Sequence, residues 1–218
     1  MTLETLVLML TMLARVEMPT LDDGSERHVR YLAGMREMAA HYLDVSKAGA
    51  IVSPEVDPLL LAAIGYGESR HQPKVRDGDC HPTLDGNQHC SVVGPMQVSR
   101  STMLTLGQTD STWSRVTLAE LRRPRTSVEA AYRLLAYHKE RCKGGVSHWL
   151  GAWSAGRCFN APIAMGAQRC ALAAAMARHA GVEPPQCAGT VRSKAYRRLI
   201  AALSEPAPET PPKASDGR

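Results

Sequence analysis

Apolar residues recur at helical spacing along most of the chain, and this pattern limits the possible folds more than any other feature. A clear case precedes Gly49, where Val29, Leu32, Ala39 and Leu43 follow a period near 3.6 residues. Aromatic residues make up only 5% of the sequence, so the core must consist mainly of Leu, Ala, Val and Met. That composition favours packed helices over a β-sandwich. We therefore expect a mainly α fold.

Capping residues, prolines and glycines indicate where the helices begin and end. Thr117 with Glu120 and Thr126 with Glu129 both have the T-x-x-E spacing of a capping box. Asp57 is expected to cap the helix that leads to Glu68, with Pro58 at its first position. The other helices are expected over residues 25–49, 99–107, 126–141, 148–153, 160–179 and 191–203.

The length of 218 residues allows one ordinary domain with appendages. We expect a helical extension over residues 1–50, a main domain over 51–203 and a Pro-rich tail over 204–218. Between Pro73 and Val92 the chain is rich in Asp, Gly, Pro, Asn and His, which predicts a short polar loop or hairpin.

The six cysteines include no C-x-x-C pair, which favours disulfides over a redox motif or a zinc ribbon. A set of reduced cysteines in a cytosolic protein is the alternative. Sequence proximity suggests the pairs Cys80–Cys90, Cys142–Cys158 and Cys170–Cys187, although spacing alone does not fix the connectivity. A zinc site formed by Cys80, His81, His89 and Cys90 is a weaker reading. We expect no bound metal and no cofactor.

The net charge of +5 favours an anionic partner such as nucleic acid or a bacterial envelope. Basic residues gather near the last expected helix, but no nucleic-acid-binding motif accompanies them. We therefore interpret them as a solvated helix face or an envelope-adhering one, and expect no nucleic-acid partner. These residues are Arg192, Lys194, Arg197 and Arg198.

No apolar run approaches the ~18–20 residues of a membrane span, so no transmembrane segment is expected. The apolar stretch from Leu6 to Ala14 follows Glu4 and no Lys or Arg, which argues against a standard signal peptide. Export by another route, for instance release with a phage particle, or a different natural start would account for this.

Four segments carry the clearest functional signal, and they occur in a fixed order: AAIGYGESRHQP, SVVGPMQVSRSTM, SVEAAYRLLAYHKERC and HWLGAWSAG. Together they resemble the lytic transglycosylase domain of the lysozyme superfamily. The signature of that family is a helix ending in Glu-Ser, a G-x-M-Q-x turn that opens the next helix, a long helix, and an A-Y-N-A-G segment. The resemblance covers about Asp57 to Gly156 and implies a lysozyme-like fold.

The resemblance also implies roles for individual residues. Glu68 corresponds to the catalytic acid and base, and Ser69 to a residue that contacts sugar and orients the glutamate. Residues expected to bind substrate in the turn and in the AWSAG segment are Gly94, Met96, Gln97, Trp153, Ser154, Ala155 and Gly156.

The AWSAG segment departs from the family pattern at two positions. Trp153 replaces the usual Tyr and Ser154 the usual Asn. Either another residue such as Tyr66 or Tyr132 supplies the missing phenolic hydroxyl, or that contact is absent. We expect Trp153 to lie near the groove and Trp149 to belong to the core.

The chemistry agrees with a role for Glu68 as a proton donor. Apolar neighbours and the C-terminal end of a helix both raise the pKa of a carboxyl group, which keeps it protonated near neutral pH. The resulting carboxylate can then accept a proton from the 6-hydroxyl of N-acetylmuramic acid, so one carboxylate suffices.

The resemblance therefore predicts a cell-envelope, exported or phage-virion protein that cleaves peptidoglycan strands and leaves 1,6-anhydro ends. One alternative is a goose-type muramidase, in which Asp77, Asp79 or Asp85 activates water, although the Gly neighbours of these residues are also typical of turns. Another is a structural or sugar-binding component of a virion or secretion assembly with little activity.

Overall fold

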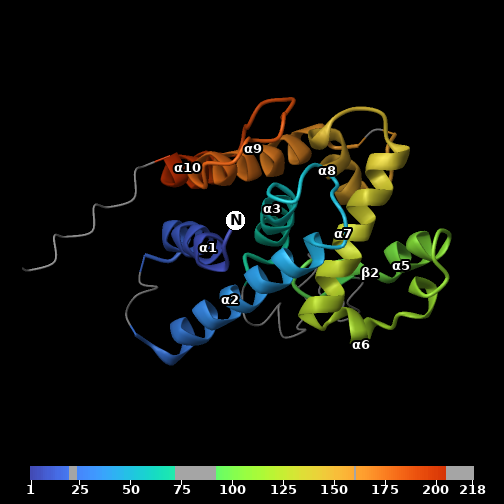
Figure 1. Cartoon of the computed structure of the whole chain (residues 1–218), viewed down its shortest axis with the longest axis horizontal. Helices are drawn as coiled ribbons and strands as arrows, with labels where there is room; N and C mark the ends of the chain where they lie inside the picture. The colour runs from blue at the N-terminus through green and yellow to red at the C-terminus, as the bar shows by residue number, and fades with distance from the viewer. Residues whose placement is uncertain (20–23, 72–91, 160, 205–218) are drawn as a thin grey trace, which may run out of the picture.

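The computed structural model describes residues 1–19, 24–71, 92–159 and 161–204, and these form a mainly helical fold, as the sequence predicts (Figure 1). A pair of two-residue antiparallel strands, β1 and β2, precedes α5. The elements are α1 (Leu3–Glu17), α2 (Glu26–Ser46), α3 (Asp57–Ser69), β1 (Val92–Val93), β2 (Val98–Ser99), α5 (Arg100–Gly107), η1 (Trp113–Arg115), α6 (Leu118–Leu121), α7 (Pro124–Arg141), α8 (Val146–Ala155), α9 (Ile163–His179) and α10 (Lys194–Ser204).

Helix α3 lies at the centre of the molecule, between α2 and α7 on one side and α9 on another (Figure 1). It is buried around almost its whole circumference, from Asp57 to Tyr66. A helix that is apolar on all sides is stable only when other elements surround it. The end of α3, which carries Glu68, is therefore held by the packing of the core.

The first 50 residues contain two helices, where the sequence analysis expected one. Thr2 caps α1 by accepting a hydrogen bond from Thr5 N (3.2 Å), and Leu6, Leu10 and Leu13 are buried. α1 packs on α2 and α10. The apolar stretch that was examined as a targeting segment is thus the buried face of an amphipathic helix in this structure.

Two of the expected caps are present. Ser99 accepts a hydrogen bond from Thr102 N (3.2 Å) at the start of α5. Thr117 and Glu120 form a complete capping box at α6, with Thr117 N donating to Glu120 Oε2 (2.8 Å). Short sequence spacings therefore predicted these helix starts correctly.

Two other caps were predicted wrongly. Asp57 lies inside α3, and its carboxylate accepts hydrogen bonds from Ile51 N (2.5 Å) and Val52 N (2.8 Å) in the preceding segment. α7 begins at Pro124, so Thr126 is already inside the helix. Proline is suited to the first helical position because its φ is fixed and it has no N–H to satisfy, which explains the earlier start. The ends of α2, α8, α9 and α10 differ from the expected ones by a few residues.

Helices α8 and α9 are in close contact because α9 is rich in Gly and Ala on its buried face. A Cβ added at Gly166 would lie 1.8 Å from the carbonyl oxygen of Ser147 and 2.6 Å from Gly151 N. Only glycine allows the backbones to approach so closely. This contact brings the next turn of α9 against the C-terminal half of α8.

Two disulfides, Cys142–Cys158 and Cys170–Cys187, confirm two of the three expected pairs. The first joins the end of α7 to the residues after α8, and the second joins α9 to the segment before α10. The pair Cys80–Cys90 lies outside the described residues. Paired cysteines of this kind fit a protein exported to an oxidising compartment.

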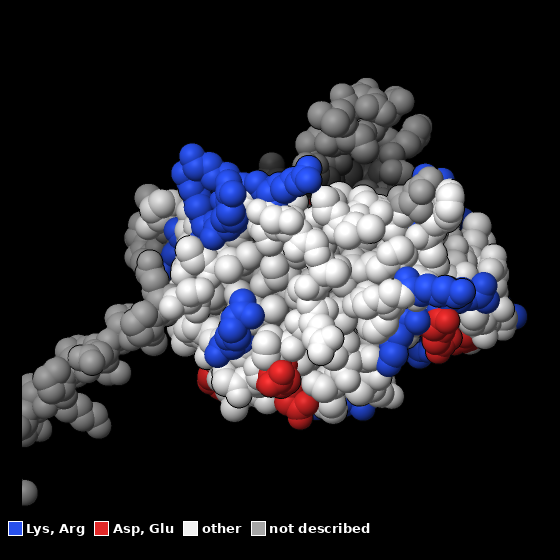
Figure 2. Space-filling view, turned by 90° about the horizontal axis from the view of Figure 1, so that it is seen from above, with Lys and Arg blue, Asp and Glu red and all other residues white. Residues whose placement is uncertain are grey.

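The basic residues near the last helix, Arg192, Lys194, Arg197 and Arg198, are all exposed, as expected for a solvated face. Figure 2 shows Lys and Arg side chains gathered in patches on the face seen from above in Figure 1. Within the part of the chain that is described, no helix is both long and apolar enough to cross a membrane.

We expect the Cys170→Ser/Cys187→Ser variant to lose about 3 kcal/mol of stability, because the bond closes a loop of 17 residues. Urea unfolding under non-reducing conditions measures this loss. The Cys142→Ser/Cys158→Ser variant, with a separation of 16 residues, is the matched comparison and should lose a similar amount. Unchanged midpoints in both variants would show that the bonds do not stabilise the fold.

Candidate active site

Glu68 lies in the last turn of α3, where the helix reaches the surface. The hydroxyl of Ser69 donates to Gly65 O (3.1 Å) and accepts from His71 N (3.1 Å), which closes the helix end. Arg70 follows in the left-handed conformation with φ of 51° and caps the helix. The Glu68 side chain keeps 21% of its surface exposed.

Arg169 of α9 contacts the Glu68 carboxylate. One terminal amino group of its guanidinium donates a hydrogen bond to Glu68 Oε1, and the other donates to Ser154 Oγ. The arginine side chain is only 3% exposed. Ser154 Oγ in turn donates to Leu150 O (3.2 Å) within α8. The guanidinium therefore joins α3, α8 and α9 at one point.

The ring of Trp153 packs against the guanidinium of this arginine. The Arg169 Cζ lies 5.2 Å from the centroid of the Trp153 ring, within the range of a cation–π interaction. Trp153 is buried, whereas Trp149 is half-buried. Trp149 packs against the hydrophobic core, as expected, and the contact with Arg169 places Trp153 beside the Glu68 site. A role of Trp153 in sugar binding stays a prediction.

Tyr196 of α10 brings a phenolic hydroxyl to the same place. A Cβ added at Gly67 would lie 2.7 Å from Tyr196 Oη and 3.2 Å from Arg169 Nε, so the absence of a side chain at position 67 makes room for both groups. Burial raises the pKa of Tyr196, and the charge of Arg169 partly opposes this rise. The hydroxyl is thus neutral at physiological pH.

The tyrosines expected to reach Glu68 bond elsewhere. Tyr66 Oη donates to Leu13 O (3.0 Å), and Tyr132 Oη donates to Gly49 O. The structure therefore does not support the alternative in which Tyr66 or Tyr132 supplies the hydroxyl, because each bonds to the backbone of a neighbouring segment. Sequence reasoning missed Arg169 and Tyr196, although an arginine within the apolar face of an alanine-rich helix is itself a signal of a buried partner.

The residues from Gly94 to Gln97 form a turn between β1 and β2, as the motif predicts. Gln97 N and its Nε2 both donate to Gly94 O, at 3.0 and 2.8 Å. Met96 N donates to Ser127 Oγ of α7 (3.2 Å). Met96 and Gln97 are buried in the structure. Their contact with saccharide, like that of Ser69, Gly94, Ala155 and Gly156, stays a prediction.

The buried side chains of Tyr42 and His71 lie close together next to Met96 of this turn. Tyr42 Oη is 3.7 Å from Met96 Sδ and 3.5 Å from His71 Nδ1. His71 has no exposed surface, and its burial lowers its pKa to about 4. The imidazole is therefore neutral and acts as a packed core residue.

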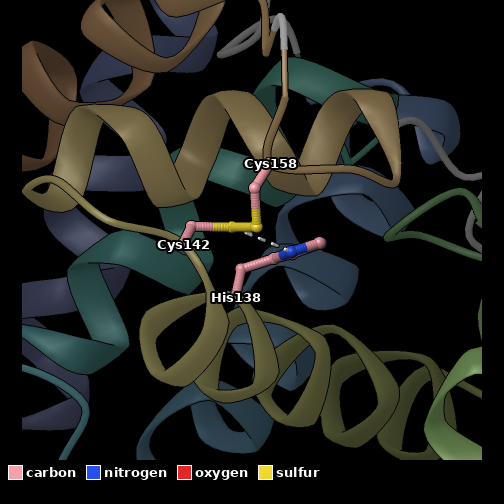
Figure 3. A group of neighbouring side chains, drawn as sticks. All are labelled: His138, Cys142 and Cys158. Carbon is pink, nitrogen blue, oxygen red and sulfur yellow. Dashed lines mark hydrogen bonds between the residues drawn. A yellow bond between two sulfur atoms is a disulfide. The ribbon is translucent and has the colours of Figure 1, made fainter.

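Figure 3 shows a group of side chains that could bind a metal ion, namely His138, Cys142 and Cys158. Their ligand atoms lie within 4.8 Å of one another, and His138 Nδ1 is 3.6 Å from Cys142 Sγ. The two sulfurs are bonded to each other, whereas zinc requires thiolates. The oxidised protein therefore has no zinc ligand set here. The other zinc reading, at Cys80, His81, His89 and Cys90, lies outside the described residues.

The arrangement around Glu68 is suited to proton transfer. A partly exposed carboxylate is held by a buried cation, and a neutral phenol lies beside it. Such a carboxylate can exchange a proton with a bound ligand without moving its backbone, because α3 is fixed by the core.

Comparison with protein families matches residues 48–162 to the family model described as the transglycosylase SLT domain. The matched region contains α3, the turn before α5, and α7 and α8, but it ends before Arg169 and Tyr196. Neither the curated proteins nor the solved structures gave a match.

The two buried histidines make the stability depend on pH. Burial lowers the pKa of both His71 and His138 to about 4, whereas an unfolded histidine protonates near 6.5. The unfolded state therefore binds more protons between pH 6.5 and 4, so stability falls as the pH decreases through this range. The expected loss is about 2 kcal/mol per histidine between pH 7 and 5.

Urea unfolding at pH 7 and 5 checks this loss. Replacing His71 or His138 by Gln should make the loss of stability between pH 7 and 5 smaller by about 2 kcal/mol, the contribution of one histidine. An equal pH dependence in wild type and in both variants would contradict the assignment.

Proposed function

We propose that this chain, which belongs to the transglycosylase SLT domain family, is a peptidoglycan lytic transglycosylase that cleaves the β-1,4 bond between N-acetylmuramic acid and N-acetylglucosamine. The observation that carries the proposal is the position of Glu68. It lies within the matched region, at the end of a core helix, with its carboxylate partly exposed and held by a cation.

In the proposed reaction Glu68 first acts as an acid. Its proton passes to the glycosidic oxygen as the bond from that oxygen to C1 of N-acetylmuramic acid breaks, and the N-acetylglucosamine unit leaves with a new hydroxyl. The carboxylate then accepts the proton of the 6-hydroxyl while that oxygen bonds to C1. The glutamic acid is restored, no water is consumed, and the product carries a 1,6-anhydro ring.

The surroundings of Glu68 differ from the apolar ones expected from the sequence. Arg169 lies against the carboxylate, and a neighbouring cation favours the charged form of a carboxyl group. This favours an ionised resting state. The acid step then requires a protonated fraction, so we propose that the enzyme works best on the acidic side of neutrality.

Two other functions remain as alternatives. A goose-type muramidase needs a second carboxylate, and its candidates Asp77, Asp79 and Asp85 lie outside the described residues. A sugar-binding component with little activity is favoured by one observation, the ion pair that occupies the Glu68 carboxylate. The experiments below separate both from a transglycosylase.

The place of action is proposed to be the cell envelope, reached by export or with a phage virion or envelope-spanning assembly. The two disulfides support an oxidising compartment, and the exposed basic face would favour adhesion to an anionic envelope.

Glu68→Gln should abolish cell-wall lysis, with a loss of at least about 10³-fold, because the amide keeps the shape of the side chain but has no proton to transfer. A zymogram on purified peptidoglycan and a turbidity assay measure the loss, and circular dichroism checks the fold. The exposed Glu55→Gln is the control and should retain full activity. More than a tenth of the wild-type rate in a folded Glu68→Gln protein would exclude Glu68 as the catalytic acid.

The products should carry anhydro-muramic ends that are lighter by one water than hydrolysis products and resist borohydride reduction. Mass spectrometry of the muropeptides before and after reduction is the measurement. Replacing Asp77, Asp79 or Asp85 by Asn should then have only a small effect on rate. Reducible ends as the main product, with one of these aspartates essential, would instead support the muramidase.

A further inference from the structure

We propose that Arg169 is a positioning residue of this active site, which orients the Glu68 carboxylate and stabilises its ionised form. The inference rests on the proposed function. It concerns a residue of α9 that lies beyond the region matched to the family. Its basis is the contact geometry of one buried guanidinium.

The burial of Arg169 requires an anionic partner. The side chain is 3% exposed, and moving a charged group out of water without a partner is strongly unfavourable. Glu68 provides the negative charge, and Ser154 accepts from the second terminal amino group. The cation thus cannot leave the carboxylate without losing its main source of stabilisation.

The same contacts limit the movement of Glu68. The arginine is fixed by Ser154 and by the face of the Trp153 ring, both on α8. A planar guanidinium directs its donors along fixed lines, so it orients the carboxylate as well as attracting it. A lysine at this position would keep the charge but lose the planar guanidinium, whose two terminal amino groups point at separate acceptors.

The charged and titratable groups near Glu68 come from several helices. Arg169 approaches from α9, and Tyr196, neutral because burial raises its pKa, approaches from α10. Arg70, which follows α3, forms an ion pair with Glu17 of α1, which offsets its charge. The ion pair with Arg169 therefore supplies the strongest described attraction on the carboxylate.

This arrangement also explains the two departures of the AWSAG segment from the family pattern. Trp153 and Ser154 are both direct contacts of Arg169. The indole offers a large ring face to the cation, and the serine offers a small acceptor that leaves space for the guanidinium. Both side chains therefore contact one guanidinium, and Arg169 lies 15 residues beyond Ser154 in the chain.

The test compares Arg169→Met, which removes the charge, with Arg169→Lys, which keeps it but loses the planar fork. The pH dependence of lysis is measured for both and for wild type. Arg178→Met, at an exposed position of the same helix, is the control. All variants are checked by circular dichroism and urea unfolding before their rates are compared.

Arg169→Met should move the alkaline limb of the kcat/KM profile upward by about 1–3 pH units, because the neutral acid form is no longer opposed by the cation. Its maximal rate should fall by about tenfold or more because the carboxylate is less well oriented. Arg169→Lys should keep the alkaline limb within about 0.5 pH unit of wild type. Its maximal rate of lysis should nevertheless fall. A fall in rate with no shift of the limb in Arg169→Met would reduce the arginine to a structural role and overturn the proposal.

A second measurement does not depend on lysis. Carbon NMR of the Glu68 carboxyl follows its titration in wild type and in Arg169→Lys and Arg169→Met proteins. We expect a lower midpoint in the two cationic forms than in Arg169→Met. The same midpoint in all three overturns the inference. If wild type shows no lysis but the midpoint differs as expected, the proposed function fails and the assignment of Arg169 stands. If Arg169→Met does not fold, the wild-type titration alone is the test. A Glu68 midpoint at or above the ordinary value for glutamate then overturns the assignment of Arg169.

Discussion

The ion pair between Arg169 and Glu68 is the interaction on which the arrangement of the site depends. A guanidinium removed from water needs a charged partner, and here the partner is the carboxylate at the end of the central helix. α8 contributes Ser154 and Trp153 to the same cation, and α10 contributes Tyr196. Helices α3, α8, α9 and α10, which are far apart in the sequence, thereby meet at one point.

The packing of the core explains how the Glu68 carboxylate is held in place. α3 is buried on all sides until its last turn, so its direction is fixed by α2, α7 and α9 and not by the ligand. The close approach of α8 and α9 at Gly166 then determines where along α8 the side chain of Arg169, one turn later, meets Ser154. A site built on rigid helices keeps its donor and acceptor atoms in place without loop rearrangement.

The sequence predicted features that depend on short spacings. The helical period identified most helices, the T-x-x-E box marked the start of α6, and neighbouring cysteines gave the two described disulfides. Glu68 was predicted as the catalytic residue from its motif; the family match covers that region, and the role itself stays a prediction. Asp57 was misread because an aspartate can satisfy loop amides as well as a helix start, and the sequence does not show which is nearer.

Features that depend on long-range packing could not be predicted in this way. Arg169 is 101 residues from Glu68, and a helical pattern shows which face is buried but not what the face meets. α1 was not recognised as a helix because an apolar run has the same composition in a targeting segment and in a buried helix face. The contact of Trp153 with a buried cation was likewise not foreseen, because the sequence does not show that Arg169 lies beside it.

The most direct test of the central claim is a crystal structure of the Glu68→Gln variant with a bound muropeptide tetramer. The account predicts that the glycosidic oxygen of one N-acetylmuramic acid unit lies at hydrogen-bond distance, about 3 Å, from the side-chain amide at position 68, with the Arg169 contact to that amide retained. A saccharide bound to this protein with no glycosidic oxygen near position 68 would contradict it.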